Sequence, residues 1–465
     1  MKIKFGTDGW RAVIGRDFTY ENVAQLVQAF CDFKSKEKNK KIILGYDRRF
    51  CSQDFAKEAA CVLLANGFFV EMSEKYVPTP LISCRVVEQK ALAGIMVTAS
   101  HNPYKWNGIK IKEKDGGSAS ASYVQGIEAQ IQKNQKQGRK IKRLDIESAI
   151  RKKQFRYFDP FSFYLKKLSK FVDLDLIKKS KLRIVFDAMH GSGTGFLKEL
   201  LGKQVIEIRS QEDPFFGGVN PEPIEKNLLP LKSAIKKENA YMGLVTDGDA
   251  DRIGAMDEKG HFISAQQIFA LLLEHLLRER RWKGQVVKTV STTLMVDRLC
   301  ETFSIPLLET PIGFKHICQA FRENKVLIGG EESGGIGIPR HVSERDGLLC
   351  ALLLLEISAQ NPMPFSKLIQ KLQKNYGPLH YRREDLSLST QHMKSIMQKL
   401  KKCDAQSFAA IKLDKKDGWK FYFSDQSWLL IRPSGTEPLL RVYAEAPKKK
   451  RTDQLIEYAK KFVEH

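Results

Sequence analysis

Several features are missing from this chain of 465 residues, and each absence argues against a class of protein. The eight cysteines form no C-x-x-C pair, so free thiols in a reducing compartment are favoured over a disulfide framework or a zinc site. The longest apolar run, residues 348–355, is far too short to span a bilayer. The first residues also lack the apolar core of a secretion signal. The sequence therefore predicts a cytoplasmic protein with no membrane partner.

Acidic residues are scarce relative to basic ones, with 54 Asp and Glu against 77 Lys and Arg, a formal charge of +23. Such an excess suits an anionic partner, which includes nucleic acid and phosphorylated small molecules. The basic residues are spread over short runs, and the sequence has no zinc finger, RNA-recognition signature or basic helix followed by heptads. The pattern favours solvated surface and predicts no nucleic-acid partner, which salt-dependent DNA or RNA binding would contradict.

Strand-like and helical patterns alternate along most of the chain, as in βαβ units with mainly parallel sheets. The expected strands lie at residues 42–45, 68–70, 93–97, 182–187, 241–245, 286–290 and 326–328, and the expected helices at 23–33, 55–65, 266–277 and 347–358. The last 90 or so residues differ, with a helix at 391–402, strands near 421–423, 428–431 and 441–443, and a closing helix from 452.

A strand that ends in a polar loop occurs three times, at Ser100, Asp247 and Glu331, which suggests three similar domains. In open parallel sheets ligands bind beyond the carboxyl ends of strands. We therefore predict an α/β protein of three similar domains with mixed or parallel sheets and a C-terminal α+β domain. The expected domain ranges are 1–145, 146–254, 255–368 and 369–465.

The first of these loops reads Thr-Ala-Ser-His-Asn-Pro over residues 98–103. Ser100 has an imidazole beside it at His101, and Lys110 follows an Asn107-Gly108 turn signal. A serine hydroxyl needs a positioned proton acceptor to become a nucleophile, and this loop offers one. The alternative is a surface turn in which serine and asparagine cap backbone groups.

The second loop carries three alternating carboxylates, Asp247, Asp249 and Asp251, followed by Arg252. Three aspartates packed together repel one another unless a cation lies between them. Oxygen ligands of this kind suit Mg²⁺. The alternative is a calcium-like turn or a solvated acidic loop.

Four further segments offer weaker signals. Residues 329–335 form a glycine-rich loop with Glu331 and Ser333, which is not a Walker loop and could equally be a flexible turn. Residues 432–438 combine an arginine fork, hydroxyls and a glycine, as a phosphate nest or a plain turn would. Arg11 near the N-terminus could stabilise a phosphoryl group or form an ordinary salt bridge. A Lys315-His316 pair follows a glycine turn, and such pairs are more often surface than site.

Taken in this order, the loops resemble the α-D-phosphohexomutase family over essentially the whole chain. The resemblance implies four domains around one central cleft and a phosphohexomutase, an isomerase of carbohydrate metabolism. It implies reversible phosphoryl transfer between O1 and O6 of a hexose phosphate through a phosphoserine and a hexose 1,6-bisphosphate, with Mg²⁺ as cofactor.

The resemblance also assigns roles to residues of this chain. It implies that Ser100 carries the phosphoryl group, and that Ser100, Asp247, Asp249 and Asp251 hold Mg²⁺. Lys110 would carry a proton with help from His101, and Arg11 and Arg252 would neutralise phosphoryl charge. Substrate would be bound by the following residues: Glu331, Ser333, Lys315, His316, Arg432, Ser434, Gly435 and Thr436.

Two departures from the family pattern lie in the loop at residues 329–335, and the first is Gly335, which stands where some phosphomannomutases and the glucosamine enzymes have histidine. Glu332 stands where phosphoglucosamine mutases typically have glutamine, which favours glucose and mannose phosphates over glucosamine phosphate. Phosphoglucosamine mutase is the first alternative, and a catalytically silent relative acting as a binding or scaffold protein is the second. We expect a monomer or homodimer, with a hinge near residues 360–375 that lets the last domain move.

Overall fold

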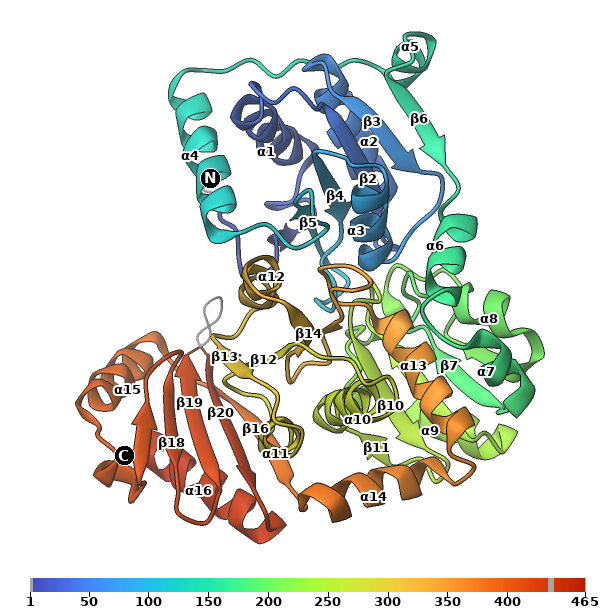
Figure 1. Cartoon of the computed structure of the whole chain (residues 1–465). Helices are drawn as coiled ribbons and strands as arrows, with labels where there is room; N and C mark the ends of the chain where they lie inside the picture. The colour runs from blue at the N-terminus through green and yellow to red at the C-terminus, as the bar shows by residue number, and fades with distance from the viewer. Residues whose placement is uncertain (1–2, 434–438, 465) are drawn as a thin grey trace.

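The computed structural model describes residues 3–433 and 439–464 and contains four β-sheets, one in each of four successive domains (Figure 1). The three α/β domains and the C-terminal domain that the sequence predicted are confirmed. Ser434, Gly435 and Thr436 lie outside the described residues.

The first domain is built on a six-stranded sheet in the order β1-β5-β4-β2-β3-β6. Strands β2, β3, β4 and β6 are parallel, and β5 runs antiparallel between β4 and β1. Its elements are β1 Trp10–Val13, α1 Tyr20–Phe33, β2 Lys41–Tyr46, α2 Ser52–Ala65, β3 Phe69–Ser73, α3 Thr79–Glu88, β4 Ala93–Val97, β5 Trp106–Lys112, α4 Ala121–Lys136, α5 Ile146–Arg151 and β6 Phe155–Phe158.

The second domain has a five-stranded sheet in the order β11-β10-β9-β7-β8, in which β7, β8 and β9 are parallel. Its elements are α6 Pro160–Ser169, α7 Leu174–Ser180, β7 Ile184–Asp187, α8 Phe196–Leu201, β8 Val205–Ile208, α9 Leu229–Glu238, β9 Met242–Thr246, β10 Ile253–Asp257 and β11 Phe262–Ile263.

The third domain has a four-stranded sheet in the order β13-β12-β14-β15, again parallel except for its last strand. Its elements are α10 Ala265–Arg278, β12 Gln285–Thr289, α11 Leu294–Thr302, β13 Leu307–Thr310, α12 Phe314–Glu323, β14 Val326–Gly330, β15 Ile336–Gly337, α13 Gly347–Gln360 and α14 Phe365–Tyr376.

One arrangement recurs in these three domains and positions their loops. In each, a buried parallel strand (β4, β9 or β14) ends in a polar loop, and the next strand (β5, β10 or β15) returns antiparallel beside it. The loops are those of Ser100, of Asp247 to Asp251 and of Glu331. All three lie beyond the carboxyl end of a parallel strand, where ligands of α/β sheets bind.

The fourth domain is an antiparallel sheet in the order β16-β20-β19-β18-β17. Its elements are β16 His380–Ser387, α15 Thr390–Lys402, β17 Lys412–Asp414, β18 Trp419–Tyr422, β19 Trp428–Pro433, β20 Leu439–Ala446 and α16 Lys449–Glu464. In Figure 1 this domain (red) follows α14.

The core is continuous through the second and third domains but separate in the fourth. A single apolar cluster includes α13, whose residues 347–358 are all buried, and also takes in side chains of α3 and α14. The fourth domain has its own cluster and meets the third through a small one of Val290, Trp428, Leu430 and Tyr443. Among the described residues, no single helix is long and apolar enough to cross a membrane; α13 and α14 meet that criterion only as a pair bent by 88°.

Three expectations differ from the observed elements. The first sheet extends past residue 145, because β6 pairs with β3, and β10 runs across the expected boundary at 254. Asn107 and Gly108 form no turn: they lie within β5, paired with Ala12 and Arg11. Residues 365–376 form α14, whose apolar face is buried, so most of the expected hinge region is a helix packed on the core; residues 361–364 form the partly exposed break between α13 and α14.

Candidate active site

Ser100 lies just after β4 with an unusual backbone conformation. Its φ angle is 53°, in the left-handed region that side chains other than glycine seldom adopt, and the residue is buried. Its amide donates to Thr98 Oγ1 at 2.9 Å, and the Thr98 hydroxyl donates to Asp47 Oδ2 at 2.6 Å. The loop therefore fixes the serine by internal hydrogen bonds.

Arg49 fixes the same loop from outside. Its Nη2 donates to the carbonyl oxygens of Ser100 and Asn102 at 2.6 and 2.7 Å, and its guanidinium lies over the Phe216 ring at 4.9 Å from the centroid. Because Phe216 belongs to the second domain, this arginine joins two domains at the serine loop.

The serine hydroxyl meets the aspartate loop directly. Ser100 Oγ donates to Asp247 Oδ2 at 2.8 Å, although 147 residues separate the two. Gly248 permits this approach, since a Cβ at that position would lie 2.5 Å from the Ser100 carbonyl oxygen. His101 Nδ1 lies 3.4 Å from Ser100 Oγ. The structure thus brings together the serine and the acidic loop that the sequence singled out.

The three aspartates converge with free oxygens. One carboxylate oxygen of each lies within 4.8 Å of the others, and all three residues are buried. Asp249 Oδ1 and Asp251 Oδ1 are buried and accept no hydrogen bond from any described residue. Unpaired buried carboxylate oxygens are costly unless a cation satisfies them, so the donor set fits Mg²⁺.

Asp247, Asp249 and Asp251 together form a carboxylate cradle, and its remaining oxygens are held by hydrogen bonds. Asp249 Oδ2 accepts from Thr79 Oγ1 and from Lys110 Nζ, the latter at 2.8 Å, and Asp251 Oδ2 accepts from Lys110 Nζ at 2.6 Å. Asp247 Oδ1 accepts from the backbone amides of Asp251 and Arg252 at 3.0 and 3.1 Å. Such outer contacts orient metal ligands.

The cradle splits the pKa values of its carboxyls. Burial raises the pKa of Asp247 well above its usual value, and the neighbouring Asp251 and Asp249 add to the increase. Burial also acts to raise the pKa of Asp249, but the charge and hydrogen bond of Lys110 outweigh it and lower that pKa. Ionisation is therefore favoured at Asp249, beside Lys110, and disfavoured at Asp247.

Lys110 is enclosed by carboxylates rather than open to a cavity. It is 1% exposed, and its Nζ lies 2.9 Å from Asp8 Oδ2 in addition to its two contacts in the cradle. Burial acts to lower its pKa, but the aspartates outweigh that effect and raise it. The side chain therefore remains a cation under all ordinary conditions.

A cavity of about 200 Å³ opens beside the cradle, and all four domains contribute to its wall. It receives His101 and Arg11 from the first domain and Arg252 from the second. Burial lowers the pKa of His101, and the charges of Arg252 and Arg11 lower it further, so the ring is neutral. The cavity is lined by Thr7, Asp8, Arg11, His101, Glu222, Arg252, Ile312, Gly313, Phe314, Glu331, Glu332, Ser333, Arg345, Arg383, Arg432 and Arg441.

Glu331 and Ser333 lie in this wall, as the sequence predicted for a ligand-binding loop. Glu331 Oε1 accepts from the Gly313 amide at 3.1 Å, and Oε2 accepts from Arg345 Nη1 at 3.3 Å. Burial raises the pKa of Glu331 to about 7 despite the opposing charge of Arg345.

The fourth domain contributes three arginines from neighbouring strands. Arg383 comes from β16, Arg432 from β19 and Arg441 from β20, and Arg432 and Arg441 are directly opposite in the ladder. Like charges facing each other across strands are unfavourable without an anion. Arg441 Nε is buried with no hydrogen-bond partner among the described residues, at 3.9 Å from Asp385 Oδ2. This wall suits a phosphate.

Two predicted substrate residues lie elsewhere. Lys315 lines a small neighbouring cavity that shares Thr7 and Asp8 with the cavity beside the cradle, and His316 is not among the described residues that line either cavity. Both residues lie in the first turn of α12, which begins directly after Gly313. Ser434, Gly435 and Thr436 of the predicted phosphate nest lie outside the described residues.

Some cavity residues were not predicted from the sequence: Asp8, Glu222, Arg345, Arg383 and Arg441. Asp8 lies in the same N-terminal segment as Arg11, so its nearness to a predicted site residue could have pointed to it. Arg345 directly precedes Asp346, which caps α13. Arg383 and Arg441 belong to regular strand patterns, where no local feature distinguishes them from surface arginines.

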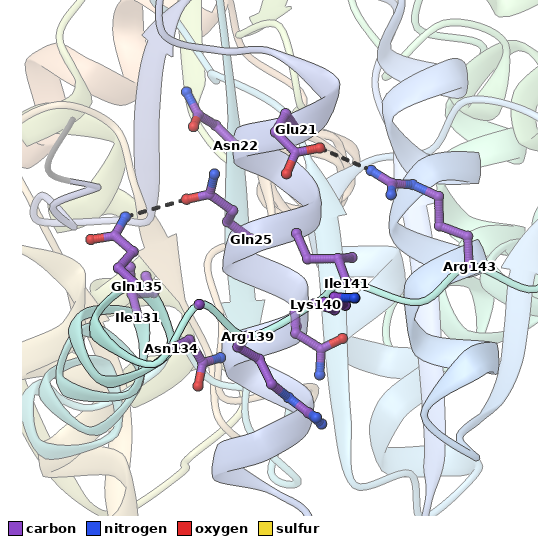
Figure 2. A pocket seen from close by; sticks show the side chains of 12 residues that line it. Glu21, Asn22, Gln25, Ile131, Asn134, Gln135, Arg139, Lys140, Ile141 and Arg143 are labelled. Carbon is purple, nitrogen blue, oxygen red and sulfur yellow. Dashed lines mark hydrogen bonds and ion pairs between the residues drawn. The ribbon is translucent and has the colours of Figure 1, made fainter.

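A larger hollow of about 610 Å³ lies on the first domain, away from these residues (Figure 2). It lies between α1, α4 and the segment 138–143, and carboxamides line much of it. Gln135 Nε2 donates to Gln25 Oε1 at 3.3 Å, and Arg143 Nη2 lies 3.2 Å from Glu21 Oε2 (Figure 2). None of the predicted site residues that the structure describes lines it.

Comparison with known families covers all four domains. Models of the phosphoglucomutase/phosphomannomutase α/β/α domains I, II and III match residues 2–138, 162–260 and 264–376, and the model of the C-terminal domain matches residues 393–461. These matches define the class of the protein: a mutase, that is, an isomerase that moves a phosphoryl group within its substrate.

The chain belongs to the α-D-phosphohexomutase family. A "Phosphoglucomutase/phosphomannomutase" of Thermococcus kodakarensis is 30% identical, with 99% of this chain and 98% of that protein covered. A protein of Methanosphaera stadtmanae named "Probable phosphoglucosamine mutase" is also 30% identical over 99% and 98% of the two chains. A Thermus thermophilus crystal structure described as a phosphomannomutase aligns over 100% of both chains, with 32% identity and a TM-score of 0.86.

Proposed function

We propose that this enzyme interconverts the 1-phosphate and 6-phosphate of glucose, and of mannose, through a phosphorylated Ser100 and a hexose 1,6-bisphosphate. The observation that carries the proposal is the 2.8 Å hydrogen bond from Ser100 Oγ to Asp247 Oδ2. Through this bond the Ser100 hydroxyl lies beside a carboxylate cradle with two oxygens that accept no hydrogen bond from any described residue, which supports its role as phosphoryl carrier.

In the first half-reaction the bond between phosphorus and Ser100 Oγ breaks, and a bond forms from phosphorus to a hydroxyl oxygen of the hexose phosphate. The sugar hydroxyl loses its proton, and the serine oxygen gains one when it is released. His101 Nδ1, 3.4 Å from Ser100 Oγ, is positioned to relay a proton at that oxygen. The family resemblance also implies a proton-carrying role for Lys110; in the unliganded protein this lysine is a cation held by Asp8, Asp249 and Asp251, so the role requires that substrate or Mg²⁺ binding loosen those contacts.

Mg²⁺ would be held by Asp247, Asp249 and Asp251 together with the phosphorylated Ser100, and when bound it supplies charge stabilisation to the phosphoryl oxygens. The protein's own cations act on the same charge. Arg11 and Arg252 line the cavity near the serine. Arg11 Nη1 donates a hydrogen bond to the side-chain oxygen Oδ1 of Asn102 at 2.6 Å, which orients the guanidinium group.

The substrate is held at two places. Glu331 and Ser333 offer a carboxylate and a hydroxyl to sugar hydroxyls, and Arg383, Arg432 and Arg441 offer guanidinium groups to the phosphate that is not transferred. After the first transfer the bisphosphate turns within the cavity, so that its two phosphates exchange positions. The second transfer then returns the other phosphoryl group to Ser100.

Coupled assays with glucose 1-phosphate and mannose 1-phosphate, primed with the matching 1,6-bisphosphate, test this proposal. We expect turnover of both sugars and loss of turnover when Mg²⁺ is chelated. Turnover that needs no bisphosphate and leaves no phosphate on Ser100 by peptide mass spectrometry would contradict the phosphoserine route.

Phosphoglucosamine mutase is the second candidate, because a relative 30% identical over nearly its full length is named so. Glu332 lines the cavity and accepts from Ser291 Oγ at 2.6 Å. Because it stands where phosphoglucosamine mutases typically have glutamine, this residue favours the first candidate. A kcat/KM for glucosamine 6-phosphate above that for glucose 6-phosphate would favour this candidate over the first.

A further inference from the structure

Arg345 lies at the point where three domains meet. It precedes α13, and its side chain is only 3% exposed. One guanidinium nitrogen, Nη2, donates to Asp251 Oδ2 at 2.7 Å and to Asp8 Oδ2. The other, Nη1, donates to Glu331 Oε2 at 3.3 Å. One planar group therefore touches the metal cradle on one side and the predicted sugar carboxylate on the other.

Gly335 is the residue past which this side chain runs. A Cβ at position 335 would lie 2.3 Å from Arg345 Cδ and 3.3 Å from Glu331 Oε2. Position 335 is not among the glycines with a positive φ, so space rather than backbone conformation requires glycine there. Arg345 cannot move aside cheaply, because its guanidinium is anchored to carboxylates of three domains.

The charges around Arg345 give it a positioning task. Asp8, Asp251, Glu331 and Glu344 all lie within 3.5 Å of its nitrogens. Burial acts to raise the pKa of Asp8, but Lys110 and Arg345 outweigh it and lower that pKa. Asp251 Oδ1 stays free of hydrogen bonds while Arg345 and Lys110 hold Oδ2, so the arginine turns one carboxylate oxygen toward the cradle.

We propose that Arg345 is a positioning residue that holds Glu331 and Asp251 at a fixed separation, and that Gly335 is glycine because Arg345 passes through the space of its side chain. This inference rests on the proposed function. The rigid fork of a guanidinium sets the distance between the sugar-binding wall and the metal cradle, which neither loop fixes alone.

Steady-state kinetics of R345M and R345K test the positioning role. R345M is expected to raise KM for glucose 1-phosphate about tenfold and to lower kcat about a hundredfold, because both Glu331 and Asp251 lose their common partner. R345K keeps a positive charge but not the fork, and we expect it to recover part of kcat while KM stays raised.

Arg322 provides a matched control. It also joins the third domain to the first, through Asp115 Oδ2 at 2.7 Å and the Ser118 carbonyl at 3.0 Å, but it does not line the cavity. R322M removes an interdomain ion pair of similar kind, and its KM and kcat should stay within about threefold of the parent. Equal losses in R322M and R345M would reduce Arg345 to an interdomain brace and overturn the proposal.

A double-mutant cycle tests the link to Gly335 without using catalysis. G335A in the parent protein should lower the urea midpoint of unfolding, because its Cβ collides with Arg345 Cδ. In an R345A background the same change should cost little, since the colliding atom is gone. Additive effects of the two changes would overturn the steric part of the inference.

The two sets of results separate this inference from the proposed function. A parent enzyme inactive on every hexose phosphate contradicts the proposed function and with it the catalytic task of Arg345. An active parent whose KM and kcat survive R345M contradicts the role of Arg345 alone.

Discussion

Ser100 shows how much of the chemistry is settled by one residue's surroundings. Its left-handed backbone, the carbonyl grip of Arg49 and the missing side chain at Gly248 act together to bring one hydroxyl to Asp247. A non-glycine residue in this conformation costs of the order of 1 kcal/mol or more, which the loop's hydrogen bonds offset. Strain of this kind is typical of groups held for reaction.

Replacement of Ser100 by alanine tests the phosphoryl carrier. S100A should lower kcat by several orders of magnitude, because no other described hydroxyl contacts the cradle except that of Thr79. The measurement is turnover of glucose 1-phosphate together with the intact mass after incubation with bisphosphate.

The exposed Ser122 is the matched control for that experiment. S122A should keep both the activity and the mass gain of one phosphoryl group. An S100A enzyme that still gains that mass and retains its rate would show that another group carries the phosphate.

Glu331 should make stability depend on pH in a defined direction. Its folded-state pKa is raised to about 7 from a usual value of 4.5, mainly by burial, so the folded protein binds the proton more tightly than the unfolded chain. Its contribution to stability is full below about pH 4.5 and is lost as the pH rises through 7. At pH 8 the buried carboxylate costs up to about 3 kcal/mol.

E331Q removes that ionisation. Calorimetry of the unliganded proteins should show E331Q more stable than the parent at pH 8 and similar to it at pH 5. A difference in melting temperature that is the same at both pH values would contradict the raised pKa. Activity of the variant should fall at pH 8, where the parent offers a carboxylate to sugar hydroxyls, and should lie closer to the parent at pH 5, where Glu331 is protonated.

At the scale of elements, the strands of the fourth domain bring three arginines from regular strand positions to one cavity wall. Arg432 in β19 faces Arg441 in β20, and Arg383 in β16 lies on the same cavity wall. A sheet that places two guanidinium groups opposite each other gives up a few tenths of a kcal/mol, which a bound phosphate returns. Asp417, at 2.8 Å from Arg432, and Asp385, at 3.9 Å from Arg441, balance part of this repulsion in the unliganded protein.

R441M should therefore weaken substrate binding without lowering the stability of the folded protein. We expect KM for glucose 1-phosphate to rise about tenfold and kcat to change much less, since the proposed function assigns Arg441 to the phosphate that is not transferred. The urea midpoint should stay equal or rise, because one repulsion across the strands is removed.

Arg451 serves as the control, because it lies on α16 and pairs with the exposed Asp425 at 2.9 Å. R451M should leave KM unchanged. A loss of stability in R441M comparable to its loss of binding would mean that the arginine holds the sheet rather than the phosphate.

At the scale of the whole molecule, the chain divides into a continuous body and one separate domain. The first three domains share contacts through the large cluster around α13, whereas the fourth adds only a small apolar contact and polar links such as Asp417 to the Ile312 amide at 2.8 Å. The joint between them is short: α14 ends at Tyr376 and β16 begins at His380. Gly377 has a φ of 83° there.

We therefore predict that the fourth domain moves about residues 377–379, and not within residues 360–375. Binding of glucose 1,6-bisphosphate should slow amide hydrogen exchange at Gly377, Leu379 and Ile312, while the amides of α14 stay unchanged; position 378 is a proline and has no amide hydrogen. Solution scattering should show a more compact particle with the bisphosphate. Exchange that changes in α14 but not at 377–379 would contradict this location.

The sequence determined the local chemistry and most of the elements. The strand-into-loop pattern located Ser100, the aspartates and Glu331, and hydrophobic periodicity located helices such as α10 and α13 within a few residues. These predictions succeed because turn chemistry, capping and apolar spacing act over short stretches of chain. Asn107-Gly108 failed as a turn because pairing with β1, almost a hundred residues earlier, outweighed a local preference.

Only the tertiary structure decided which charges meet. Arg345 and Lys110 both contact the carboxylate of Asp8, although Arg345 and Asp8 are 337 residues apart in the sequence. Nothing in their neighbours along the chain shows that these three residues meet. The same holds for Gly335, whose lack of a side chain is explained by an arginine ten positions later that folds back across it. Electrostatic and steric fit depend on distance in space, which the order of residues does not contain.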